Sequence, residues 1–281
     1  MGMLLFLSPP TEMVVKDAAR AVKRLAIPPE QNGIATPKGE TTCSSVLVMV
    51  PAHNEQENIG HVVKEIKQNT PYADVLVIND GSSDATAEMA QRSGADVLNL
   101  PHNLGIGGAV QAGIKFAWGC GYPFVVRVDG DGQHNAADIS RLLSVVMQGQ
   151  ADVAIGARFC ENKETYRPPF ARRLGIRMFS LLVSILVGRR VYDPTSGLKC
   201  MNREAMKCFI RRYPQDYPEV EAHILMHKAG LKVLEIPVVM RPRQAGVSSI
   251  DALRSIYYMF KVSLATLIAA LQIKPRYYRN F

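Results

Sequence analysis

The segment Phe124-Val-Val-Arg-Val-Asp-Gly-Asp-Gly-Gln-His134 passes directly from a largely apolar run into an acidic, glycine-rich stretch. Other apolar runs lie at 46–50, 75–78, 97–100 and 153–155, and helical stretches separate them at 56–68, after Ser83, at 105–118 and at 135–148. Apolar strands that alternate with helices predict an α/β fold, in which helices cover both faces of a mainly parallel sheet. Ligands of such sheets bind beyond the carboxyl ends of the strands.

Polar residues follow four of these runs. The segments are Pro-Ala-His-Asn-Glu at 51–55, Asn-Asp-Gly-Ser-Ser-Asp at 79–84, Asp-Gly-Asp-Gly-Gln-His at 129–134 and Gly-Ala-Arg at 156–158. The fold would bring all four to one edge of the sheet. A purely structural protein does not need such a cluster, so this edge is the candidate functional site.

Length and composition favour one main domain with appendages. The chain has 281 residues, of which 47% are apolar and 21% are charged, as is usual for globular proteins. We expect the main domain at residues 46–250. Residues 1–45 are expected to form an amphipathic helix and a polar linker, and residues 251–281 an amphipathic helical extension.

Charge and cysteine content limit the partners. A net charge of +8 favours anionic partners, such as nucleotides, lipid phosphates or a membrane surface. Nucleic acid is not expected, because no basic run has interleaved aromatic residues and no recognition-helix or zinc-finger spacing occurs. The five cysteines are odd in number and far apart. They indicate neither a disulfide framework nor a zinc site, so we expect the protein in the reducing cytosol.

Two apolar stretches, at 178–187 and 262–273, require a membrane test. They contain about ten and about twelve residues, whereas a spanning helix needs about twenty, so neither is expected to span a bilayer. Each could be a buried helix or an amphipathic helix on a bilayer surface. Basic residues beside both stretches fit the surface interpretation: Arg172, Arg173, Arg177, Lys261 and Lys274.

Asp129, Asp131 and Gln133 are spaced two apart, so a locally extended backbone would point their side chains to one side. Two carboxylates and an amide oxygen suit Mg²⁺ or Mn²⁺, which keep several water ligands and bridge to phosphate oxygens. Gly130 and Gly132 would allow a tight turn and the close approach of a ligand. An Asp/Gly turn without a metal is the alternative interpretation, and the position after a buried strand favours the metal.

Three other features are less specific. A turn and a helix cap explain most of segment 80–84 but not Asp80, whose carboxylate could bind a nucleotide base or ribose. Segment 103–108 lacks the third glycine of a dinucleotide fingerprint, and it fits either a phosphate-facing helix start or close packing of helix and loop. His223 and His227 fit a helix face better than a zinc pair, because no glutamate directly follows the first histidine.

Taken together, these segments resemble the family 2 inverting glycosyltransferases, in particular dolichol-phosphate mannose synthase and its bacterial polyprenyl-phosphate relatives. Besides 51–55, 80–82, 129–134 and 156–158, the resemblance rests on Asp-Pro-Thr-Ser-Gly at 193–197 and Arg-Gln-Ala-Gly-Val-Ser at 243–248. It covers about residues 46–250. It implies a GT-A fold, a nucleoside-diphosphate sugar donor, a divalent metal and inversion at the anomeric carbon.

By position, the resemblance also implies a role for individual residues. Those that would line the nucleoside pocket are Pro51, His53, Glu55, Ile78 and Asp80. Asp129 and Gly130 would lie beside the ribose and diphosphate. Asp131 and Gln133 would hold the metal, and Arg158 and Arg243 would meet the diphosphate as charge-assisted donors.

Three residues depart from the family pattern. Asn79 replaces the first residue of the usual Asp-Asp pair, His53 stands where Tyr is common, and Ser249 stands where the mannose synthases often have Lys. Ser249 removes a cation near the phosphates. The donor and the assignment to the mannose synthases therefore stay open.

The expected mechanism follows from where charge develops. The leaving diphosphate gains negative charge, which the metal, Arg158 and Arg243 would stabilise most in the transition state. A lipid phosphate acceptor is already anionic and needs no general base. A sugar hydroxyl would need one, and Asp193 is the candidate for this catalytic role. Alternatively, Asp193 simply begins a turn before Pro194.

We therefore expect a cytoplasmic enzyme, peripheral on the inner face of the cytoplasmic membrane, that transfers a sugar to a polyprenyl phosphate or lipid-linked saccharide in cell-envelope glycan or glycolipid synthesis. A small membrane protein is a further candidate partner. The alternatives are transfer to a soluble hydroxyl acceptor, or a scaffold protein that binds a nucleotide sugar without turnover. A processive polysaccharide synthase is not expected, because Trp118 follows Ala117 rather than the Arg of a Gln-x-x-Arg-Trp motif.

Overall fold

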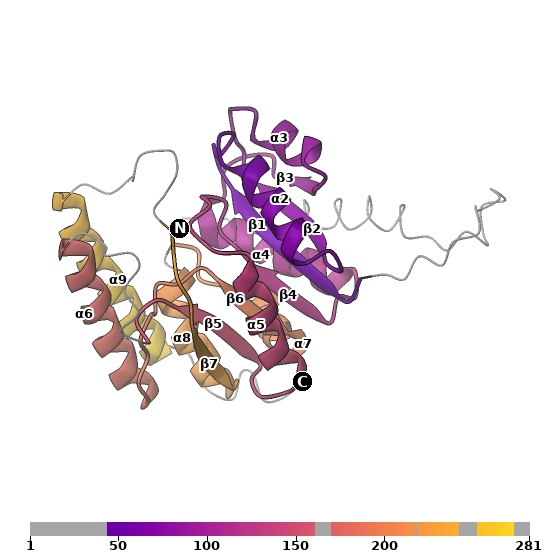
Figure 1. The fold of residues 1–281 in the computed structure, drawn as a ribbon. Coiled ribbons are helices and arrows are strands. Elements are labelled where there is room, and N and C mark those ends of the chain that lie inside the picture. Colours follow the sequence, from indigo (N-terminus) through magenta and orange to yellow (C-terminus); the bar gives the residue numbers. More distant parts are fainter. Residues whose placement is uncertain (1–43, 161–169, 217, 242–251, 273–281) are drawn as a thin grey trace, which may run out of the picture.

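A computed structural model describes residues 44–160, 170–216, 218–241 and 252–272 of the chain (Figure 1). Most of the predicted N-terminal segment 1–45 lies outside the described residues. So does the predicted motif 243–248, together with Arg243 and Ser249. The predicted domain boundaries at 45/46 and 250/251 stay predictions.

A seven-stranded sheet forms the centre of the molecule, with the strand order β3-β2-β1-β4-β6-β5-β7 (Figure 1). The strands are β1 (Val46–Ala52), β2 (Asp74–Asn79), β3 (Asp96–Asn99), β4 (Phe124–Arg127), β5 (Val153–Ala157), β6 (Lys199–Asn202) and β7 (Val233–Pro237). All neighbours pair in parallel except β6, which is antiparallel to both β4 and β5. The prediction of a mainly parallel sheet is confirmed.

Helices cover both faces of the sheet, as predicted. They are α2 (Ile59–Asn69), α3 (Thr86–Arg92), α4 (Gly105–Gly119), α5 (Ala137–Met147), α6 (Phe170–Val187), α7 (Arg203–Arg211), α8 (Pro218–Ala229) and α9 (Ala252–Gln272). Alternate residues of each strand face opposite sides, so Leu47 and Met49 belong to one core and Val46 and Val48 to the other. The helices α2 and α5 cover the core that contains Val46 and Val48. The helices α4, α7 and α8 cover the core that contains Leu47 and Met49.

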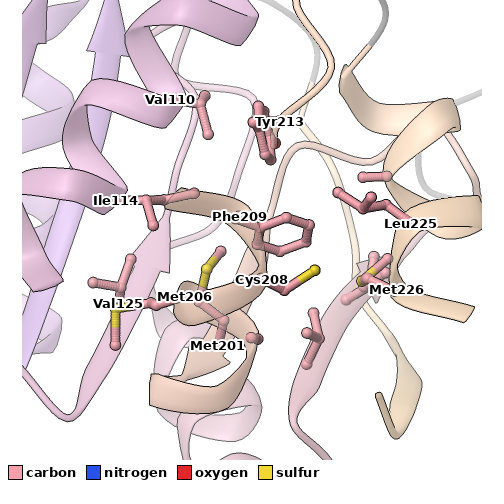
Figure 2. Packing of buried hydrophobic residues seen from close by; sticks show 14 of the residues in the cluster. Val110, Ile114, Val125, Met201, Met206, Cys208, Phe209, Tyr213, Leu225 and Met226 are labelled. Atoms are coloured by element: carbon pink, nitrogen blue, oxygen red, sulfur yellow. The ribbon is translucent and has the colours of Figure 1, made fainter. Parts of the chain in front are cut away.

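The core that contains Leu47 and Met49 is packed around α7. Figure 2 shows Phe209 of α7 between Ile114 of α4 and Leu225 of α8. The Phe209 ring meets the Tyr213 ring edge-on, with centroids 5.2 Å apart. The helix α8 packs against α6, α7 and α9, and its residue Glu219 reaches Arg127 of β4.

The helices α6 and α9 pack against each other at one side of the molecule (Figure 1). One face of each is buried, through Phe179 and Val183 of α6 and through Val262 of α9. The other face exposes large apolar side chains: Leu174, Met178, Leu181 and Ile185 of α6, and Phe260, Leu264, Leu267, Ile268 and Leu271 of α9. Among the described residues, no helix has the length and apolar character that crossing a membrane requires.

Candidate active site

The candidate site lies at the sheet edge where the carboxyl ends of β1, β2, β4 and β5 meet. The strand β6 runs the opposite way and therefore begins at this edge. The strands β1, β2, β3, β4, β5 and β7 all run toward this edge, and the segments of interest follow β1, β2, β4 and β5 or lie just before β6. The predicted site residues in the described part of the chain all lie on or beside these segments.

The loops after β1 and β2 are interlocked. His53 Nδ1 lies 2.8 Å from the Asp80 carbonyl oxygen. Asn54 has a positive φ of 54°, and its Oδ1 accepts the Ser83 N–H at 2.9 Å while its own N–H donates to Ser82 Oγ at 3.0 Å. Behind these loops, Pro51 and Ile78 are buried register partners in β1 and β2. Hydrogen bonds therefore join the two loops into one unit.

Two further predicted donor-site residues extend this unit. Asp80 is buried, and its Oδ1 accepts the Leu104 N–H at 2.7 Å, which ties β2 to the start of α4. Burial raises the pKa of Asp80, although the hydrogen bond opposes this. Glu55 Oε2 accepts a hydrogen bond from Asn58 Nδ2 at 2.7 Å, just before α2.

Close packing explains part of the glycine-rich segment before α4. A Cβ on Gly107 would overlap the backbone oxygens of Pro214 and Gln215. This favours the packing interpretation of segment 103–108 over the phosphate-facing one.

Asp129 is held by two cationic or polar neighbours. Arg127 donates to Asp129 Oδ1 through Nε at 3.2 Å and NH2 at 2.9 Å, and His134 Nε2 lies 3.2 Å from Oδ2. Burial alone would raise the pKa of Asp129, but the Arg127 charge and the His134 hydrogen bond outweigh it and hold the pKa below its usual value. Asp129 is therefore an oriented, ionised carboxylate at the edge of the sheet.

Arg127 also connects this carboxylate to α8, because its NH2 donates to Glu219 Oε1 at 2.8 Å. Neither Arg127 nor Glu219 was predicted from the sequence. A charged residue inside the apolar run 124–128 was the available signal for Arg127, whereas nothing in the sequence connects it to Glu219.

Asp131 and Gln133 flank a turn, with Gly132 at a φ of 74°, rather than lying in the extended backbone that was predicted from the sequence. Asp131 Oδ1 accepts the Gln133 N–H at 3.1 Å. The Gln133 amide nitrogen donates to the Arg241 carbonyl oxygen at 3.3 Å, so the amide oxygen is the side-chain atom that can face a cation. No group of three or more His, Cys, Asp or Glu residues within the described ranges is placed to hold a metal. A carboxylate and an amide oxygen fit Mg²⁺ or Mn²⁺, which would keep positions for water and phosphate oxygens.

Arg158 and Asp193 form a bidentate ion pair. Arg158 Nε lies 2.6 Å from Asp193 Oδ2, its NH2 lies 2.7 Å from Oδ1, and its backbone N–H donates to Oδ2 at 3.0 Å. Thr195 Oγ1 accepts a further bond from NH2 at 2.6 Å. The Asp193 side chain is 0% exposed. Burial alone would raise the pKa of Asp193, but the bonds from Arg158 outweigh it and lower the pKa. This geometry favours orientation of Arg158 over proton abstraction as the role of Asp193.

Glu235 of β7 supports this pair from behind. Its carboxylate accepts the backbone N–H groups of Tyr192 at 2.9 Å and Asp193 at 2.8 Å. Val191, two residues earlier, is tied to α6, since its N–H donates to Ser184 Oγ at 2.9 Å and its carbonyl accepts from Ser180 Oγ. The sequence carries no local signal for these contacts, because Glu235 is distant from Asp193 along the chain.

The segment that leads into β6 joins the two acidic residues of the site. It begins at Asp193 and passes Gly197, where a Cβ would overlap the Asp129 carboxylate. It ends at Lys199, which lies opposite Arg127 in the β4–β6 register. Lys199 is 2% exposed, and its Nζ has no hydrogen-bond partner among the described residues. Burial lowers the pKa of Lys199 to about 8.

His223 and His227 do not form a metal pair. His223 is buried, whereas His227 is exposed, as expected for a helix face. Burial lowers the pKa of His223 to about 3, so its imidazole is neutral beside Lys199.

Comparison with known proteins agrees with this arrangement. Residues 47–210 match the family model described as Glycosyl transferase family 2. An uncharacterized protein of Methanocaldococcus jannaschii is 34% identical over 201 residues, covering 71% of this chain and 82% of that protein. The polyprenol monophosphomannose synthase of Mycolicibacterium smegmatis is 28% identical over 254 residues, covering 83% and 91%. The undecaprenyl-phosphate mannosyltransferase of Micrococcus luteus is 27% identical over 215 residues, covering 73% and 87%.

The fold also has solved counterparts. The structure of glucosyl-3-phosphoglycerate synthase from Mycobacterium tuberculosis, in complex with Mn²⁺, UDP and glucosyl-3-phosphoglycerate, superposes with a TM-score of 0.64 at 20% identity. The match covers 85% of this chain and 87% of that one. At this level of identity the likeness concerns the fold.

Proposed function

The chain is a glycosyltransferase that belongs to glycosyl transferase family 2, and on this basis we propose that it transfers a sugar from a nucleoside-diphosphate sugar to a polyprenyl phosphate, with inversion at the anomeric carbon. The names of the relatives from Mycolicibacterium smegmatis and Micrococcus luteus support a polyprenyl-phosphate acceptor. The observation that carries the proposal is that the Asp193 carboxylate is buried, ionised and paired with Arg158.

The donor half of the proposal rests on the strand ends. The interlocked loops with His53 and Asp80 would hold the nucleoside, and Asp129 would lie beside the ribose and diphosphate. Asp131 and Gln133 would hold Mg²⁺ or Mn²⁺, which would neutralise charge on the leaving diphosphate.

The acceptor half rests on the Arg158–Asp193 pair. A sugar hydroxyl must lose a proton to attack, whereas Asp193 is buried, ionised and fully engaged by Arg158 and by backbone groups. A phosphate monoester is already anionic, and it needs cationic donors rather than a base. Arg158, held rigidly by Asp193 and Thr195, would supply such donors to phosphate oxygens of donor or acceptor.

A lipid acceptor would also explain the apolar surface of α6 and α9. In the chain, α6 lies between the two partners of the ion pair, so the exposed apolar side chains are close in sequence to Arg158 and Asp193. Leu181 is 64% exposed and Leu271 85% exposed, and Arg177 and Lys261 are exposed near them. We place this surface on the cytoplasmic face of a membrane that contains anionic lipids.

The test is a transfer assay. Purified protein would be incubated with Mn²⁺ or Mg²⁺, a panel of nucleotide sugars, and vesicles that contain a polyprenyl phosphate. We expect a polyprenyl-phosphate sugar with inverted anomeric configuration. Transfer only to soluble hydroxyl acceptors would overturn the proposed acceptor. Nucleotide-sugar binding without any turnover would indicate the scaffold alternative.

A further inference from the structure

Glu65 of α2 contacts both sides of the segment that would hold the metal. Its Oε1 accepts the Ala136 N–H at 3.2 Å, and its Oε2 accepts a hydrogen bond from Arg241 NH1 at 2.9 Å. Ala136 follows the segment 129–134, whereas Arg241 follows β7. One carboxylate thus joins three elements that are distant in sequence.

Arg241 in turn contacts Gln133 through its backbone. The Arg241 N–H donates to the Gln133 carbonyl oxygen at 2.8 Å, and the Arg241 carbonyl accepts from Gln133 Nε2 at 3.3 Å. These two bonds fix both the backbone and the amide orientation of Gln133. The Gln133 amide oxygen would therefore be oriented for a cation only while Arg241 keeps its position.

The Glu65 carboxylate holds the Arg241 side chain in this position. The Glu65 side chain is 14% exposed and that of Arg241 is 37% exposed, so the pair is partly shielded from water. His61, one turn earlier on α2, lies 3.7 Å from the same carboxylate oxygen. A fully exposed pair contributes little, but a shielded carboxylate that also accepts a backbone N–H constrains its partners more strongly.

We propose that Glu65 is a positioning residue for the donor site, which fixes segment 131–136 through Ala136 on one side and through Arg241 on the other. It touches no substrate in this role. The proposal rests on the proposed function, because the segment it fixes is the one that would hold the metal and diphosphate.

The first measurement needs no ligand. Hydrogen exchange of the backbone amides in 131–136 would be followed in wild-type protein, Glu65→Ala, Glu65→Gln and Arg241→Ala. We expect exchange to accelerate about tenfold in Glu65→Ala, and less in Glu65→Gln, which keeps an acceptor for Ala136. The matched control is the exposed pair Glu88–Arg92 of α3, with N–O distance 3.4 Å, whose alanine variants should leave this exchange unchanged.

The second measurement is Mn²⁺-dependent binding of UDP and GDP by calorimetry. Glu65→Ala and Arg241→Ala should each raise the Kd about tenfold, and the double variant should bind no more weakly than the weaker single variant. A purely structural role would lower the Tm of Glu65→Ala but leave the exchange of 131–136 and the Kd unchanged, and that result would overturn the proposal.

The two hypotheses fail separately. If wild-type protein binds neither nucleotide with Mn²⁺, the proposed donor site is wrong, whereas the exchange experiment still decides whether Glu65 fixes the segment.

Discussion

Gly197 lies against the carboxylate of Asp129 so closely that a Cβ on Gly197 would overlap Asp129 Oδ2. Gly197→Ala should therefore push the carboxylate away from Arg127 and His134. We expect transferase activity to fall at least about tenfold, because Asp129 would no longer lie where the donor requires it. Gly119→Ala is the control, since a Cβ there meets no atom within 4 Å. Equal activity of both variants would contradict this role of Asp129.

Asp131→Asn tests the metal site. The substitution keeps the size of the side chain but removes the charge that a divalent cation requires, so Mn²⁺ affinity and sugar transfer should both fall about a hundredfold. Asp96→Asn, at an exposed position in β3, is the control. Electron paramagnetic resonance of Mn²⁺ measures the affinity independently of turnover. Full activity after thorough chelation would exclude a metal-dependent mechanism.

Asp193→Asn tests the ion pair. It leaves Arg158 buried without a counter-ion, so the free energy of unfolding should fall by about 3–5 kcal/mol at pH 7. The pKa of Asp193 is lower in the folded protein than its value of 3.8 in the unfolded chain. The ionised carboxylate therefore adds its full stabilisation of the folded state above pH 3.8, and this stabilisation is lost as the pH falls through the pKa of the folded protein. Urea titrations of wild type and variant should differ most at neutral pH and converge in acid. A constant difference down to pH 2 would show that charge is not the cause.

Lys199→Met tests the buried amine of Lys199. The pKa of Lys199 is about 8 in the folded protein and 10.5 in the unfolded chain, so the folded state binds fewer protons between these values. The free energy of unfolding of the wild type should therefore rise between pH 8 and 10.5 relative to the variant. At pH 7 the variant should be the more stable, by up to about 3 kcal/mol. Parallel pH profiles of the two proteins would refute this account.

Leu181→Gln combined with Ile185→Gln tests the membrane surface. Both side chains are exposed on α6, and their replacement removes apolar area that would enter a bilayer. Sedimentation with anionic vesicles should fall at least about fivefold, with an unchanged Tm. Met147→Gln, on the exposed side of α5, is the matched control and should sediment like wild type. If all three proteins sediment alike, α6 is not the docking surface.

The parallel strands β1 to β5 could be predicted because largely apolar runs mark them, whereas the parallel strand β7 was not predicted, since Glu235 interrupts its short apolar run. The strand β6 was not predicted, since Lys-Cys-Met-Asn at 199–202 has no apolar run and its antiparallel pairing depends on the whole chain between β5 and β7. The same limit applies to the site. Asp129 and Arg158 stand at strand ends and could be chosen from sequence. The contacts of Arg127 with Glu219, of Glu65 with Arg241 and of Glu235 with Asp193 join distant segments, and only the folded chain reveals them.

The reversed direction of β6 has a consequence for how such an enzyme could be redesigned. Residues that follow the parallel strands reach the site as the chain leaves the sheet, and in the proposed function they would form the donor half. The residues 193–198 arrive as the chain enters the sheet, and they contact residues that follow the parallel strands at two points: Asp193 and Thr195 bind Arg158, and Gly197 lies against Asp129. If the proposed roles hold, donor and acceptor recognition would depend largely on different segments of the chain, which the Arg158–Asp193 pair joins. Grafting a new segment before β6, with Asp193, Thr195 and Gly197 retained, would then be a route to a transferase with the same donor and a different acceptor.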